Sequence, residues 1–122
     1  MRRGTACVEF ALVAPLLIFL LLAMVEVGRA IQVQQVLTNA VREGARAYAE
    51  PANTEDDVKD AVNAAMGNIK VLPAITCTTD GSAVTVAAAL PFQDVAYFKP
   101  FIIRSNLTAY ATFRKQTMFV EE

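Results

Sequence analysis

One acidic side chain, Glu9, lies at the start of the longest apolar stretch of this 122-residue chain, an uncharged run over residues 10–25. A carboxylate at the centre of a bilayer costs roughly 2.5 to 3.5 kcal/mol, and less near an interface, so an acid in such a segment is a candidate functional group. Gly4 precedes it by five residues. Cleavage between Gly4 and Thr5 would create an α-ammonium one helical turn from Glu9, and the ammonium of a neighbouring copy could neutralise the carboxylate. The alternative is an interfacial acid that is hydrated among the headgroups.

The sequence offers few other residues or motifs that could support catalysis or bind a metal or phosphate. The chain has no histidine, which removes the usual general base and the commonest metal ligand. No glycine-rich phosphate loop, Cys-x-x-Cys pair or nucleophile elbow is present. The acidic group Glu55-Asp56-Asp57 favours the start of a helix over a metal site, and Glu9 and Glu26 are too far apart to act as a pair. We therefore expect no enzyme activity, no metal and no cofactor.

Charge and cysteine content narrow the partners further. A formal net charge of -1, with scattered basic residues, gives no field that would gather nucleic acid. Cys7 lies in the apolar segment and Cys77 in the region beyond it, so we expect no disulfide between them. We interpret Cys77 as a small buried hydrophobic residue, with a reactive thiol as the less favoured alternative.

The apolar segment reaches membrane-spanning length, about 20 residues, once Thr5 to Val8 are added. Arg2 and Arg3 precede it, which puts the N-terminus in the cytoplasm and the rest of the chain outside. A cleavable secretory signal is disfavoured, because the best small-residue site, at Gly28, lies in what reads as continuous helix. We expect a membrane-spanning half over residues 5–26 and an exported domain over residues 27–122.

Helical periodicity continues beyond the membrane segment. We expect one helix from Thr5 to Glu50, about 69 Å long, ended by Pro51 and bent or loosened at Pro15. The apolar face of its second half comprises Val33, Val36, Leu37, Ala40, Val41, Ala45 and Tyr48, opposite Gln32, Gln35, Asn39, Arg42, Glu43 and Arg46. Its length and amphipathic second half predict a spine on which a small domain packs.

A shorter second helix should follow. Thr54 and Asp57 have the spacing of a capping box, and Gly67 is a stop signal. The apolar stripe between them is narrow and comprises Val58, Ala61, Val62, Ala65 and Met66. We expect this helix to cover one edge of a sheet.

The strongest strand signal is Asp80-Gly81, a dipeptide typical of type I′ hairpins. A turn at these two residues predicts the pairs Thr79 with Ser82, Cys77 with Val84, Thr76 with Thr85 and Ile75 with Val86, with Ile75, Cys77, Val84 and Val86 on one face. A last strand is expected over residues 107–118, and residues 91–103 read as a loop or broken strand. The predicted fold is α+β: the long helix, a short second helix and an antiparallel sheet of three to four strands on the spine.

Several fixed spacings resemble the TadE-like family of minor pilins, or pseudopilins, of the tight-adherence (Tad/Flp) pilus. They are Gly4-x-x-x-x-Glu9-Phe10-Ala-Leu-x-x-Pro15, Glu26-x-Gly28-Arg29 and Arg42-Glu43-Gly44-Ala45-Arg46-Ala47. The resemblance covers residues 3–49 and is weaker beyond. It implies a leader of residues 1–4, removed after Gly4 by a membrane-embedded prepilin peptidase, and contact between Glu9, followed by Phe10, and Thr5 of a neighbouring subunit.

The same resemblance implies other pilin subunits, inner-membrane platform proteins, an assembly ATPase and the lipid bilayer as partners. It also implies a bacterial inner-membrane location before incorporation into an extracellular pilus. The charged group Arg42, Glu43 and Arg46 is either a solvated helix face or a docking surface. Gly28 and Gly44 are candidates for close approach of a helix or a sheet, and Gly28, Arg29 and Gly44 are also possible helix-docking residues. The competing hypothesis is an uncleaved bitopic protein whose exported domain binds a ligand or partner.

Overall fold

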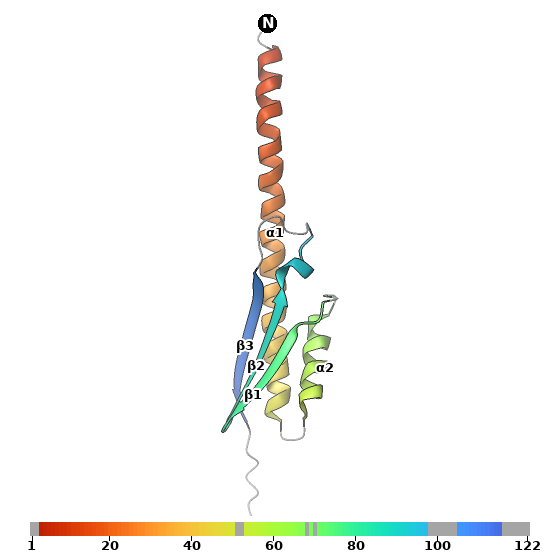
Figure 1. Ribbon diagram of the computed structural model, residues 1–122, viewed down its shortest axis with the longest axis vertical. Helices are drawn as coiled ribbons and strands as arrows, with labels where there is room; N and C mark the ends of the chain where they lie inside the picture. Colours follow the sequence, from red (N-terminus) through yellow and green to blue (C-terminus); the bar gives the residue numbers. More distant parts are fainter. Residues whose placement is uncertain (1–2, 51–52, 68, 70, 98–104, 116–122) are drawn as a thin grey trace, which may run out of the picture.

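The computed structural model describes residues 3–50, 53–67, 69, 71–97 and 105–115. One helix, α1 (Arg3–Ala49), runs the length of the molecule, and a small domain packs along its second half only (Figure 1). The domain consists of α2 (Glu55–Met66), β1 (Ala74–Asp80), β2 (Ala83–Pro91), the 3-10 turn η1 (Phe92–Asp94) and β3 (Asn106–Arg114). This arrangement confirms the predicted α+β architecture.

α1 has 47 residues and is therefore about 70 Å long. It continues without interruption through Pro15, where we expected a bend or loosening. It ends at Ala49, where the Asn53 side-chain amide donates a 2.9 Å hydrogen bond to the Ala47 carbonyl. That bond satisfies one of the carbonyls that a helix end leaves free. Pro51, the predicted terminator, lies outside the described residues.

The core confirms the amphipathic second half of α1. Five residues of its predicted apolar face are fully buried, whereas the six residues predicted for the opposite face are all exposed. The buried members are Val33, Leu37, Ala40, Val41 and Ala45. Each fully buried side chain of the size of valine or leucine contributes on the order of 2 kcal/mol, so this face holds the domain to the spine.

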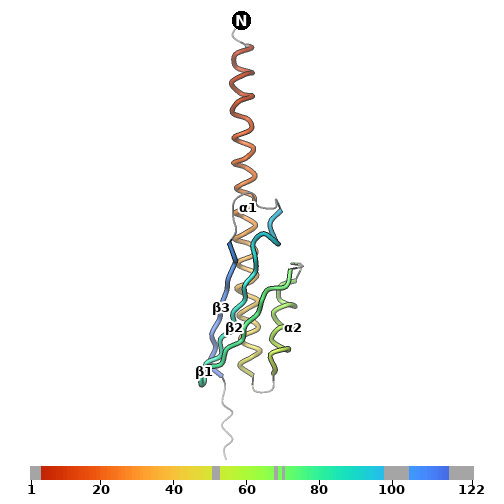
Figure 2. The backbone as a smooth tube through the Cα atoms, in the orientation of Figure 1, coloured from red at the N-terminus to blue at the C-terminus, as the bar shows by residue number. Residues whose placement is uncertain are grey.

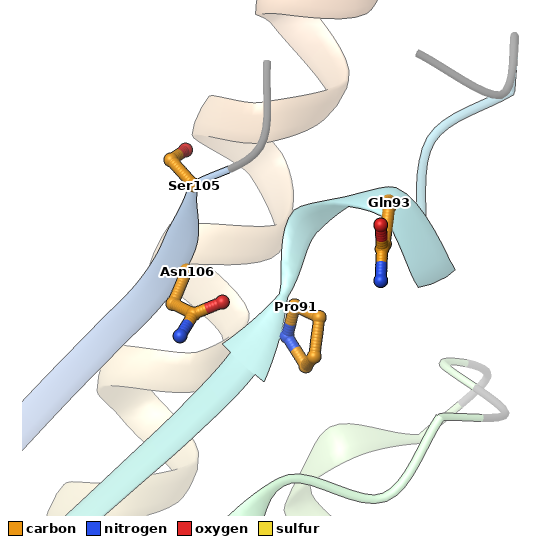
Figure 3. A pocket seen from close by; sticks show the side chains of 4 residues that line it. All are labelled: Pro91, Gln93, Ser105 and Asn106. Atoms are coloured by element: carbon orange, nitrogen blue, oxygen red, sulfur yellow. The ribbon is translucent and has the colours of Figure 1, made fainter.

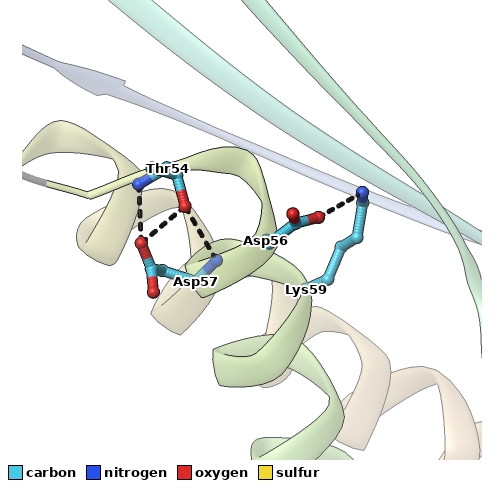
Figure 4. Close-up of polar contacts among 4 residues, drawn as sticks. All are labelled: Thr54, Asp56, Asp57 and Lys59. Carbon is cyan, nitrogen blue, oxygen red and sulfur yellow. Dashed lines mark hydrogen bonds and ion pairs between the residues drawn. The ribbon is translucent and has the colours of Figure 1, made fainter.

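α2 begins with the predicted capping box (Figure 4). The Thr54 backbone N–H donates to Asp57 Oδ2 at 2.7 Å, and the Asp57 N–H donates to Thr54 Oγ1 at 3.5 Å. Lys59 forms an ion pair with Asp56 at 2.9 Å. The hydrogen bonds from the Thr54 hydroxyl and then its backbone N–H lower the pKa of the Asp57 carboxyl. The predicted stop at Gly67 is present, with φ of 59°.

The position of α2 differs from the expectation that it covers a sheet edge. It packs chiefly against α1, to which it returns antiparallel, and places Val58, Val62 and Met66 in the common core (Figure 2). The connection between the two helices is short, and short helix connections favour antiparallel neighbours. The apolar stripe of α2 is therefore buried by the spine.

The sheet is an antiparallel meander in the order β1-β2-β3. Its inner face comes from alternate residues of β2, among them the buried Val84, Val86, Ala88 and Leu90. Phe92, in η1, is only 2% exposed and extends that core toward the apolar half of α1. Residues 98–103 of the predicted loop, and residues 116–118 of the predicted last strand, lie outside the described residues.

The predicted hairpin exists, but its register is shifted by two residues. The turn is Gly81-Ser82, with Asp80 paired to Ala83 and Cys77 to Val86. Gly81 has φ of 57° and Ser82 a negative φ, as in a type II′ turn. A type I′ turn at Asp80-Gly81 would force the aspartate into a positive φ as well. A two-residue shift keeps each side chain on its face, so Ile75 and Cys77 still lie on the core side.

Candidate membrane and assembly site

The predicted cleavage and assembly residues all lie in the first two turns of α1. Gly4 is exposed, and no described atom lies within 4 Å of the place where its Cβ would be. Thr5 and Glu9 are four positions apart, so they share one helix face with an axial separation of about 6 Å. Glu9 is exposed and forms no ion pair with any described residue. The spacing thus brings the two groups within one turn, and no described residue supplies a cation that pairs with Glu9.

The rest of this half of α1 is an uncovered apolar surface. It is long and apolar enough to cross a membrane, and none of it is buried by the domain. Phe10, beside Glu9, is 68% exposed. Its large apolar side chains reach from Val8 to Val27 and would be costly to leave in water. By length and composition, this helix is suited to anchor the protein in a membrane.

Glu26 lies at the far end of this surface, 17 positions or about 26 Å from Glu9. The two carboxylates therefore cannot cooperate. Both Glu26 oxygens are shielded from solvent, and neither accepts a hydrogen bond from a described residue. Gly28, two positions further, is exposed with nothing described within 4 Å of a Cβ position, so no other described element approaches the helix closely there.

Arg29, a predicted docking residue, holds a segment of its own chain. Its Nε donates a long hydrogen bond of 3.4 Å to the Val95 carbonyl, and its Nη1 donates to Gln32 Oε1 at 3.4 Å. Its guanidinium carbon lies 5.1 Å from the centroid of the Tyr97 ring, a cation–π geometry. The segment that follows η1 is thereby fixed to α1 at the point where the apolar half ends.

The other predicted docking residues, in the segment 42–46, do not share one environment: the charged ones are exposed and the glycine is buried. Arg42, Glu43 and Arg46 are exposed, and none takes part in an ion pair within the described part of the chain. Gly44 is buried against α2: a Cβ added there would overlap Val62 Cγ2 and lie 3.4 Å from Val58 Cγ1. Gly44 therefore permits close packing of α1 on α2, whereas the three charged side chains remain free at the surface.

No catalytic constellation emerges from the described residues. A hollow between the end of β2 and the start of β3 is lined by Pro91, Gln93, Ser105 and Asn106, which offer amides and a hydroxyl (Figure 3). The described residues contain no group of three or more potential metal ligands. Cys7 and Cys77 are both free. Burial, followed by the nearby Glu55, raises the pKa of the Cys77 thiol, which favours the unreactive protonated form.

Sequence reasoning missed three features. Val95 and Tyr97 lie in the segment that was predicted only as a loop or broken strand, and their contacts with Arg29, which is 66 residues from Val95 in the chain, have no local pattern. The burial of the Glu26 oxygens had no local signal. The side-chain amide of Gln34, a helix residue to which the sequence assigned no role, donates a 2.8 Å hydrogen bond to the Thr108 carbonyl of β3. An exposed amide on a helix gives no sequence pattern that would predict this bond.

Comparison with known proteins agrees with the N-terminal motifs. No curated protein and no solved structure matches the chain. The matched family is described as TadE-like protein, and the match extends from residue 4 to residue 46, from the predicted cleavage glycine to the exposed arginine of the distal charged group. Residues 4–46 of this chain are therefore similar to a TadE-like protein.

Proposed function

We propose that this chain is a minor pilin, or pseudopilin, of a tight-adherence pilus, processed after Gly4 and assembled through α1. The observation that carries the proposal is the division of α1: the domain buries its second half and leaves its apolar first half entirely uncovered. Such a surface can be held in lipid and later packed against like helices. The TadE-like match over this same segment supports a role in the Tad pilus.

Glu9 would act in the transfer from lipid to filament. Removal of residues 1–4 by a prepilin peptidase would leave the Thr5 ammonium on the same helix face as Glu9. In lipid, each isolated charge carries a solvation penalty, which pairing between neighbouring subunits reduces. Since Glu9 has no cationic partner among the described residues, its carboxylate is available for the Thr5 ammonium of an adjacent subunit.

The remaining partners follow from this assignment. Platform proteins and an assembly ATPase would extract the subunit from the inner membrane, with its N-terminus cytoplasmic and its domain outside. Arg42, Glu43 and Arg46 would contact a neighbouring pilin or the assembly machinery, since they are exposed and have no ion pair within the described subunit. The function is one of packing and recognition, without catalysis.

The test is Glu9→Ala in the native host, with Asp80→Ala as the matched control. Asp80 is also an exposed acid, but it lies at the hairpin end of β1, outside the membrane segment. We expect Glu9→Ala to be processed normally, as seen by its mass, and to lose incorporation into pili. The control should assemble like the wild type. Normal incorporation of the Glu9→Ala subunit would refute the charge-pairing role.

A further inference from the structure

Arg29 and Tyr97 lie where the uncovered helix surface meets the domain. Glu26 is the first charged residue after the apolar run, so the hydrocarbon boundary cannot lie far beyond it. Arg29 is three positions further, about 4.5 Å along the axis. A headgroup layer is roughly 5 to 7 Å thick on each side of the hydrocarbon core. Arg29 therefore sits at headgroup depth whenever the apolar half of α1 spans a bilayer.

The contacts of Arg29 bring the domain to the same depth. Its hydrogen bond to Val95 and its 5.1 Å stacking distance to Tyr97 fix residues 95–97 at the level of this helix turn. Tyr97 is nevertheless 67% exposed, and Val27 and Ile31 of the same helix region are 52% and 55% exposed. An exposed tyrosine on one side of the helix, and exposed aliphatic side chains at a similar depth on the other side, are typical of the membrane interface.

We propose that Arg29 and Tyr97, which we call the neck contact, bind phospholipid headgroups and seat the exported domain directly on the membrane surface. Tyr97 would place its ring between the upper acyl chains and the headgroups, with its hydroxyl toward water. Of the five N–H donors of Arg29, two are engaged by Val95 and Gln32, which leaves three for phosphate oxygens.

The ligand is the phosphate that glycerophospholipids share, rather than net negative charge. Asp94 is exposed in η1 and Glu26 lies one turn before Arg29, so the described residues of the neck carry no positive excess. Binding should therefore occur on zwitterionic bilayers. This inference requires only that α1 spans a bilayer and is independent of cleavage or pilus assembly.

The chain has no tryptophan, which allows a site-specific fluorescent reporter. The experiment places Tyr97→Trp and, separately, the control Tyr110→Trp in the full chain, reconstituted in phosphatidylcholine bilayers with and without lipids brominated near the top of the acyl chains. Tyr110 is a fair control because it is 79% exposed on β3. The Gln34–Thr108 bond, and the direction of β3 away from the apolar half, put Tyr110 roughly 14 Å further from the bilayer than Arg29 (Figure 1).

We expect blue-shifted emission and several-fold stronger bromolipid quenching for the reporter at position 97 than for that at position 110. Adding Arg29→Ala to Tyr97→Trp should reduce the quenching. Equal quenching at both positions would overturn the proposal. Protection from aqueous iodide without bromolipid quenching would also overturn it, because a neighbouring protein would then cover Tyr97. If Tyr97→Trp lowers the thermal midpoint, Gln93→Trp, exposed in η1, gives the same test.

Discussion

Gly44→Ala tests the packing of α1 on α2. The added Cβ would overlap Val62 Cγ2, and Val62 is fully buried. A valine in a helix has one strongly preferred rotamer, so its methyl group cannot swing away cheaply. Overpacking of this kind costs about 1 to 3 kcal/mol, whereas replacing a helical glycine by alanine returns about 1 kcal/mol. The net expectation is a loss of about 1 kcal/mol.

The assay is thermal and denaturant unfolding of the full chain in detergent micelles. A loss of about 1 kcal/mol corresponds to a thermal midpoint lower by roughly 4 to 8 °C for a domain of this size. Gly28→Ala is the matched control, because nothing described lies within 4 Å of its Cβ position. It should leave the midpoint unchanged or raise it slightly.

A double-mutant cycle with Val62→Ala assigns the cause. Removing the Val62 methyl groups alone should cost about 2 kcal/mol. In the double variant, the alanine at position 44 enters the vacated space, so the combined loss should be smaller than the sum by about 1 to 2 kcal/mol. Additive losses, or a Gly44→Ala chain as stable as Gly28→Ala, would refute the account of this helix contact.

Three further outcomes concern α2 and β1. Thr54→Val should lower the free energy of unfolding by about 1 kcal/mol through loss of the cap, and an unchanged urea midpoint, with Thr76→Val as the exposed-threonine control, would contradict it. The pKa of the Asp57 carboxyl is lower in the folded state than its ordinary value of 3.8, so its stabilising effect is present above that pH and is lost as the pH falls through the folded value. Unfolding midpoints of wild type and Asp57→Asn should therefore converge in acid, and a gap that persists to the lowest pH would rule this out. Since burial raises the pKa of the Cys77 thiol, iodoacetamide should alkylate it more slowly in the folded Cys7→Ser chain than in the urea-unfolded chain, and equal rates would be inconsistent with its packing.

The sequence predicted correctly those features that depend on residues close together in the chain. The buried face of α1 follows from the 3.6-residue repeat of Val33, Leu37 and Ala40, and the start of α2 follows from Thr54 and Asp57. The predicted pairing failed by two residues because Asp80-Gly81 and Gly81-Ser82 both permit a two-residue turn. The ladder favours the turn in which only glycine needs a positive φ.

Contacts between distant segments could not be predicted in the same way. The stacking of Tyr97 on Arg29 depends on where β2 ends against the spine, and neither residue carries a local mark of it. The assignment of α2 to α1 rather than to the sheet edge has the same origin, because Val58 and Val62 suit either surface. Gly44 is intermediate: its cost in a helix indicated close approach, but not the partner.

The central claim is that, after processing, the apolar half of α1 begins with the free ammonium of Thr5, on the same helix face as Glu9. Intact-mass measurement of the protein from its native membrane, combined with N-terminal sequencing, tests this directly. The account predicts a chain that starts at Thr5 and lacks the four residues before it. A chain that still starts at Met1 would contradict it and favour an uncleaved bitopic protein with an exported binding domain.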